Sequence, residues 1–237
     1  MLALALKIQP LLEARGATVF LTRPTEANLH LAERAAKTNL ISLEAMLHSP
    51  YHHHYEVTKL MAIMENIIND FEKYAPIYFN FPFDWSFTRE IHPDLERIFQ
   101  LQAHPLIKDN FLFISLHSNA TASPINPNIS GADVYHMTHH YWRNQNYFTN
   151  YANEDRNNLF GQMLLDNIHA LGISRREVKP GNWFVIREHN LPGVLVENGF
   201  HTNPGDRALL SSPGFLEELA LAYEDAIVRY FRYIELR

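Results

Sequence analysis

A chain of 237 residues is long enough to bury a full core, and 46% apolar with 19% charged residues excludes a disordered protein. It has no cysteine, which excludes disulfides and thiolate zinc sites, so any metal has to be bound by His, Asp or Glu. The net charge of -6 without a Lys/Arg stripe argues against nucleic acid as a partner, and no run approaches the roughly 18 apolar residues of a membrane span.

The first elements alternate between helix and strand. Residues 2–15 are predicted as a helix that Gly16 caps, Ala17–Thr22 as a buried strand, and Leu29–Ala36 as a short helix. The leucine-rich start, Met1–Lys7, lacks the basic segment and the small-residue cleavage site of a signal peptide. Short connections between helices and strands predict a mostly parallel sheet that is covered by helices.

Residues 40–110 interrupt this alternation. Apolar spacing from Val57 to Phe71 predicts an amphipathic helix, a cluster of aromatic residues and prolines follows from Pro76 to Phe87, and Leu95–Leu101 predicts a second short helix. We expect this block to be a helical insertion within one domain that spans residues 1–237.

The alternation returns after residue 110. The remaining predicted elements are strands at 111–116, 132–136, 183–186 and 194–196, and helices around 159–171 and 216–231. The expected fold class is therefore α/β, a single mostly parallel twisted sheet with helices on both faces and a helical insertion at about 40–110.

Two buried strands end in side chains that can do chemistry. His117 follows the strand at 111–116, and Glu197 follows Val194–Val196, with Gly199 expected to end that strand. A carboxylate at the tip of a buried strand is costly to desolvate unless a metal, a cation or a catalytic task accounts for it. We therefore expect the imidazole and the carboxylate to face one pocket as part of a hydrolytic metal site.

Four segments in this order resemble the zinc-dependent N-acetylmuramoyl-L-alanine amidases, which cleave peptidoglycan. The segments are Leu11–Arg23, Glu33–Asn39, Phe113–Ala120 and Leu191–Pro204. The His-Ser-Asn motif at His117 and the Val-Glu-Asn-Gly-Phe motif at Glu197 are specific when they occur together. The resemblance covers nearly all of the chain except residues 40–110 and a loop around 138–155.

The resemblance implies the roles of these two residues. Family members bind one zinc ion through two histidines and a glutamate, and a further glutamate transfers protons. By motif, His117 resembles the second histidine ligand and Glu197 the catalytic glutamate. The implied reaction is cleavage of the amide bond between N-acetylmuramic acid and L-alanine in the cell envelope, either periplasmic or extracellular. The implied protein is a monomer with peptidoglycan as substrate and a regulatory protein as a further partner.

The sequence departs from the family pattern before the first helix. The family's first histidine ligand, in a Gly-His-Gly-Gly turn, and its glutamate ligand both precede that helix, and neither is present here. We interpret the chain as an amidase domain that is incomplete at the N-terminus and lacks two of three zinc ligands. The alternative is a catalytically inactive remnant that serves as a muropeptide-binding or regulatory module.

Other interpretations of the polar residues stay open at this point. His117 could simply bond a backbone carbonyl, and Glu197 could cap a turn or pair with Arg187. A third function, a zinc peptidase that uses His52–His54, is less favoured, because three adjacent histidines cannot all face one ion. Four further histidines could lie near the expected site: His136, His139, His140 and His201.

Overall fold

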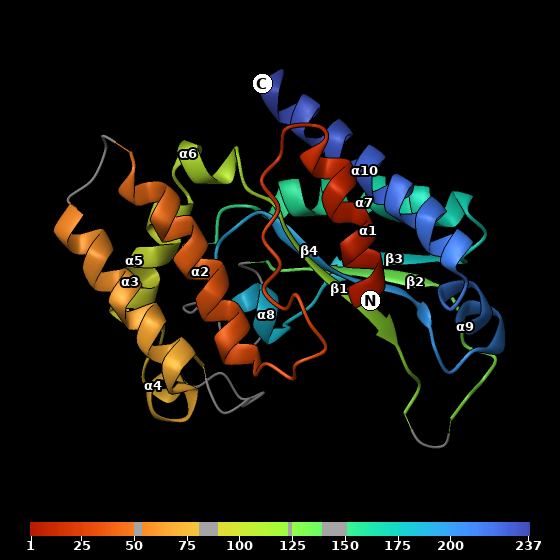
Figure 1. The fold of residues 1–237 in the computed structure, drawn as a ribbon, viewed down its shortest axis with the longest axis horizontal. Coiled ribbons are helices and arrows are strands. Elements are labelled where there is room, and N and C mark those ends of the chain that lie inside the picture. Colours follow the sequence, from red (N-terminus) through yellow and green to blue (C-terminus); the bar gives the residue numbers. More distant parts are fainter. Residues whose placement is uncertain (50–53, 81–89, 123–124, 139–150) are drawn as a thin grey trace.

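The computed structural model describes residues 1–49, 54–80, 90–122, 125–138 and 151–237 (Figure 1). The helices within these ranges are α1 (Leu2–Glu13), α2 (Leu31–Leu47), α3 (His54–Asn69), α4 (Phe71–Tyr78), α5 (Pro93–Gln102), α6 (Pro105–Lys108), α7 (Glu154–Ala170), α8 (Phe184–Arg187), α9 (Pro204–Leu210) and α10 (Pro213–Glu235). The strands are β1 (Phe113–Asn119), β2 (Ala132–His136), β3 (Arg175–Pro180) and β4 (Gly193–Phe200). No described helix is both long and apolar enough to cross a membrane.

The four strands form one sheet in the order β1-β4-β2-β3. β1 runs parallel to β4, and β2 runs parallel to β3, whereas β2 and β4 are antiparallel. Two of the three strand pairs are therefore parallel, which confirms the expected α/β class with a mostly parallel sheet. The antiparallel pair brings the start of β2 to the same end of the sheet as the end of β4.

An apolar core lies between one face of the sheet and helices α1, α7 and α10. Val134 and Val196, which are in register on β2 and β4, are fully buried in this core. Gly161 lets α7 approach the sheet, because a Cβ there would lie 2.8 Å from Val178 and 3.1 Å from Val134. The helix–sheet packing on this face is therefore tight.

The opposite face of the sheet packs against a second layer, made of α2 to α6 and α8 (Figure 1). Leu195 of β4 contributes to this core, since its side chain points away from those of Val194 and Val196. A capping box at His30 and Glu33 begins α2, and Asp70 and His92 cap α4 and α5. The residues between 40 and 110 thus form much of the layer that covers this face.

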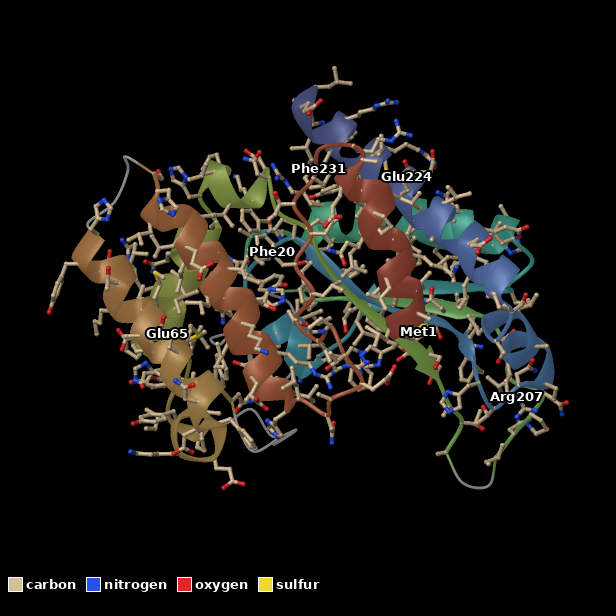
Figure 2. All side chains as sticks on the ribbon, viewed as in Figure 1. Met1, Phe20, Glu65, Arg207, Glu224 and Phe231 are labelled. Atoms are coloured by element: carbon tan, nitrogen blue, oxygen red, sulfur yellow. The ribbon has the colours of Figure 1, made fainter. Side chains whose placement is uncertain are left out.

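Two predicted strands are wrong. Ala17–Thr22 is irregular and partly exposed, with Phe20 55% exposed between α1 and α2 (Figure 2), because no described strand lies beside it to supply ladder hydrogen bonds. The segment 183–186 forms the start of α8 instead of a strand. Four consecutive apolar residues suit a buried helical turn as well as a buried strand, so periodicity could not decide between them.

Candidate functional site

His117 and Glu197 lie side by side on neighbouring strands. They are paired in the parallel register of β1 and β4, so both side chains project from the same face of the sheet. This face is the one that carries Leu195, and the two residues lie toward the carboxyl ends of both strands. Both residues lie within their strands and not after them. They are therefore lateral neighbours on one face of the sheet.

The side chain of Glu197 is a partly buried carboxylate with one oxygen that has no hydrogen-bond donor among the described residues. Among the described residues, no hydrogen-bond donor reaches its buried Oε2 atom. Burial, and secondly the negative charge of Asp133, raise the pKa of Glu197 to about 7. A carboxyl group with this pKa is half-protonated near neutral pH, which suits a group that accepts a proton and then donates it.

Asp133 is the lateral neighbour of Glu197 on its other side. It is paired with Glu197 in the antiparallel register of β2 and β4, and its side chain is only 2% exposed. Arg176 and Lys179 from β3 hold its two oxygens at 2.8 Å and 2.9 Å. Asp133 is therefore balanced by two cations of its own, and no cation in the described part of the chain pairs with Glu197. The one signal for it in the sequence is a carboxylate within the otherwise apolar start of the strand Ala132–His136.

The imidazole of His117 is held in its neutral form. Burial, followed by the positive charges of Arg34 and Arg23, lowers the pKa of His117 below its usual value. Arg34 itself has a lowered pKa because of burial and the neighbouring charge of Arg23. A neutral imidazole keeps a lone pair at neutral pH, and this is the form that binds a metal.

Hydrogen bonds from the opposite face fix the ends of β1 and β4. Asn198 is fully buried, donates to the backbone oxygen of His117 at 3.1 Å, and accepts at 2.7 Å from the hydroxyl of Tyr223 on α10. Asp206 accepts from the backbone N–H groups of Gly131 and Phe200, each at 2.8 Å. These contacts hold the strand ends in place on either side of Glu197.

Gly199 does not end the strand, contrary to expectation. It lies within β4 with a φ of 140°, a conformation that residues with a side chain rarely adopt. The β1–β4 register shifts between His117 and Asn119, beside this glycine. The irregularity lets the chain continue to Phe200 while the side chain of Glu197 keeps its place on the sheet.

Within the described ranges, the other candidate histidines form no cluster with Glu197 that could hold a metal ion. His136 is buried at the far end of β2, where its Nδ1 lies 3.0 Å from the oxygen of Met137. His201 is exposed, with its Nδ1 3.3 Å from the Oγ of Ser118. His54 is exposed at the start of α3, and the four remaining histidines lie outside the described residues: His52, His53, His139 and His140.

Arg187 does not pair with Glu197. Its Nε donates at 2.7 Å to Glu188, and both side chains are buried next to α8. The interpretation of Glu197 as the partner of Arg187 is therefore wrong.

The described residues do not fit a complete zinc site. In the described ranges, no three His, Cys, Asp or Glu side chains are close enough together to hold a metal ion. A catalytic zinc needs three protein ligands, and His117 is one imidazole beside one carboxylate. A cavity of about 350 Å³ lies elsewhere, between α1 and α2 against residues 19–24.

Comparison with known families gives one match that includes this site. The family profile described as N-acetylmuramoyl-L-alanine amidase matches residues 94–229, more than half of the chain and all four strands. The chain is 32% identical over 121 residues to the N-acetylmuramoyl-L-alanine amidase LytC of Bacillus subtilis (strain 168). This match covers 51% of the chain but only 22% of LytC, so the chain spans about a fifth of that relative's length.

Solved structures are similar in fold. One is the catalytic domain of CwlV, an N-acetylmuramoyl-L-alanine amidase from Bacillus (Paenibacillus) polymyxa var. colistinus, with a TM-score of 0.55 and 19% identity, covering 98% of this chain and 82% of that one. Another is the CwlD amidase from Clostridioides difficile in complex with the GerS lipoprotein, with a TM-score of 0.55 and 17% identity, covering 98% of this chain and 84% of that one. At these identities the likeness concerns the fold alone.

Proposed function

The chain belongs to the N-acetylmuramoyl-L-alanine amidase family, and we propose that it is a peptidoglycan hydrolase with Glu197 as its catalytic acid and base. The bond cut joins the lactyl group of N-acetylmuramic acid to the L-alanine of the stem peptide. One observation carries the proposal. Glu197, within the family match, has a buried Oε2 to which no described group donates, and its pKa is raised to about 7.

The proposed role of Glu197 is to move one proton. In its ionised form it takes a proton from the water molecule that attacks the amide carbonyl, and a C–O bond forms. In its protonated form it gives that proton to the nitrogen of L-alanine as the C–N bond breaks, which regenerates the carboxylate. The products are a free lactyl carboxylate and a free peptide amine.

His117 is proposed as a zinc ligand, although the described residues supply no second and third ligand beside it. Members of the family are generally zinc-dependent, and a bound zinc ion acidifies water and polarises a carbonyl. Because the described residues do not complete such a site, the proton steps above are assigned to Glu197 alone. Zinc content, measured on the purified chain and on its His117→Ala variant, tests whether His117 contributes to metal binding.

Muropeptide hydrolysis tests the proposed activity. Purified muropeptides are incubated with the wild-type chain and with Glu197→Gln, and the released peptides and lactyl-sugar products are separated by chromatography. We expect Glu197→Gln to lower the rate by about 10²- to 10⁴-fold, because it cannot transfer a proton. Glu218→Gln, which changes an exposed glutamate on α10, is the matched control and should keep wild-type activity.

The same assay separates the enzyme from the alternative, a binding or regulatory module. A wild-type chain that binds muropeptides but releases no product would favour the module. Equal activity in the wild type and in Glu197→Gln would contradict the role of this carboxylate.

We also propose that the chain acts in the cell envelope, where its substrate lies. It is proposed to be a monomer with a single domain, in which residues 40–110 form a helical insertion. A regulatory partner is a further part of the proposal. The complex of CwlD with the lipoprotein GerS supports it, since that amidase has a similar fold. Capture of envelope proteins on the immobilised chain, followed by size measurement of the complex, would test for a partner.

A further inference from the structure

Trp183 and Tyr135 form an aromatic surface on the β2–β3 side of the sheet, beside the last residues of β2. Trp183 precedes α8 and is 38% exposed, and its ring meets that of Tyr135 edge-on at 5.6 Å and 84°. Gly181 lies against both rings, since a Cβ there would be 2.6 Å from Tyr135 Cδ1 and 2.9 Å from Trp183 Nε1. The missing side chain at Gly181 therefore allows the two rings to meet.

This aromatic surface is on the same face of the sheet as Glu197. Tyr135 is in register with Leu195, two residues before Glu197, so the two side chains share a face and are separated by roughly 7 Å along the strand. The pKa of Tyr135 is raised by burial and by the charges of Asp133 and Glu197, which agrees with this separation. A molecule that rests on Trp183 would therefore extend toward Glu197.

The charged groups on this side already have partners. Lys179 lies 5.1 Å from the centre of the Tyr135 ring, and its ammonium group is 2.9 Å from Asp133 and 3.3 Å from Glu177. Its positive charge is therefore offset by two carboxylates. This side presents aromatic rings and balanced polar groups, which suits a neutral ligand with hydroxyl and amide groups.

The β1 side of Glu197 differs from the β2–β3 side in its charge. There Arg34 and Arg23 act on His117 with positive charge. Arg23 lies 3.7 Å from the exposed Glu26, whereas no described carboxylate lies within salt-bridge distance of Arg34. Stem peptides carry carboxylates and glycan rings carry hydroxyl and acetamido groups. The charge distribution therefore favours the peptide on the β1 side and the sugar on the β2–β3 side.

We propose that Trp183 and Tyr135 form a binding subsite for an N-acetylhexosamine ring of the glycan strand. The apolar face of the ring lies on the indole of Trp183, and Lys179 and Glu177 are within reach of its polar substituents. This inference rests on the proposed function, because it takes the scissile bond to lie at Glu197. It makes Trp183 a specificity-determining residue for the sugar side of the substrate.

Binding of a peptide-free sugar tests the subsite without catalysis. The probe is the tetrasaccharide of N-acetylglucosamine, titrated into the ¹⁵N-labelled chain while the indole N–H signals of its three tryptophans are followed. Loss of one signal in Trp183→Phe assigns Trp183. We expect this signal to shift on titration, and affinity measured by calorimetry to fall about tenfold in Trp183→Ala. Tyr55→Ala, which removes an aromatic ring that is 85% exposed on α3, should bind like the wild type.

Kinetics on two substrates give a second readout. Trp183→Ala should raise KM about tenfold for a muropeptide that carries its sugar, with kcat within about threefold, and should leave cleavage of an N-lactoyl peptide without sugar unchanged. Trp183→Phe, which keeps a ring, should lie between the two. The subsite would be overturned if the Trp183 signal did not shift, or if Trp183→Ala lost the same activity on both substrates. If the wild-type chain binds the tetrasaccharide at Trp183 but cleaves neither substrate, the subsite stands and the proposed hydrolase function fails.

Discussion

Two regions on the same side of the sheet differ in how completely their buried charged groups are hydrogen-bonded. Next to α8, the guanidinium of Arg187 donates to Glu188 at 2.7 Å, to Asn182 at 3.2 Å and to the backbone oxygen of Asn80 at 3.1 Å. At the strand ends, Glu197 has a buried oxygen to which no described group donates. The first region satisfies its charges, and the second leaves one carboxylate unsatisfied.

The difference indicates what each region does. A buried ion pair with hydrogen bonds to its charged groups is a structural feature, because removing one partner leaves an uncompensated buried charge. A carboxylate without a donor gains little from being ionised, so its pKa rises into the range where it exchanges protons at neutral pH. At α8 hydrogen bonds from neighbouring groups therefore stabilise the buried charges, whereas Glu197 has no such donor among the described residues.

The largest expected effect on stability comes from breaking the satisfied pair. Arg187→Met leaves Glu188 buried without its guanidinium, and we expect the free energy of unfolding to fall by about 3–5 kcal/mol. The double variant Arg187→Met/Glu188→Leu should recover much of this loss, because it removes both charges. Urea denaturation measures both, and a loss below about 1 kcal/mol for the single variant would show that the pair does not matter.

A smaller loss is expected on the opposite face of β4. Asn198→Ala removes the bonds to His117 and Tyr223 and leaves buried polar groups unpaired, which should cost about 1–3 kcal/mol. Asn66→Ala, at an exposed position of α3, is the matched control and should change stability by less than about 0.5 kcal/mol. If the two variants have the same stability, the hydrogen bonds of Asn198 do not fix the strand ends.

Glu197 should make stability depend on pH. Its pKa is higher in the folded chain, at about 7, than the ordinary value of 4.5, so between these values the folded state binds more protons than the unfolded state. Stability contributed by this group is therefore present below pH 4.5 and is lost as the pH rises to 7. We expect a loss of about 1 kcal/mol, reduced by partial exposure, that is absent in Glu197→Gln. Denaturation curves of both chains at several pH values would measure it, and parallel pH dependences would contradict this assignment.

The smallest predicted effect concerns Asp133. Asp133→Asn removes the negative charge beside Glu197, so the pKa of Glu197 should fall by roughly half to one unit. The acid limb of the pH–activity profile should move by the same amount toward lower pH. Glu218→Gln, which changes an exposed carboxylate on α10, is the control and should leave the profile in place. An unmoved limb in Asp133→Asn would mean that Asp133 does not act on Glu197.

The helices and strands that could be predicted from the sequence are those with regular apolar spacing or a long apolar run. The helices around α1, α7 and α10 have regular apolar spacing, and the apolar runs at 111–116 and 194–196 lie on β1 and β4. β3 was missed because Arg175–Pro180 is charged and largely exposed at the edge of the sheet, and it resembles a loop in composition. Edge strands need only one paired side, so their sequences carry little apolar signal.

For the site, the sequence located the two motifs but not their surroundings. His117 and Glu197 are adjacent because of the β1–β4 register. The two strands are about 80 residues apart in the chain, and their register is fixed only when they pack together. Asp133 and Trp183 join the region through the antiparallel pairing of β2 and through the helical turn α8. Neither pairing has a local signal in the sequence, so these neighbours could be found only in the folded chain.

The central claim is that Glu197 is a carboxyl group poised to exchange protons near neutral pH. A ¹³C NMR titration of the glutamate side-chain carboxyl carbons, assigned by the signal that disappears in Glu197→Gln, tests it most directly. We predict a midpoint near pH 7 for Glu197. A midpoint near pH 4.5 would contradict it, because the group would then be an ordinary ionised carboxylate.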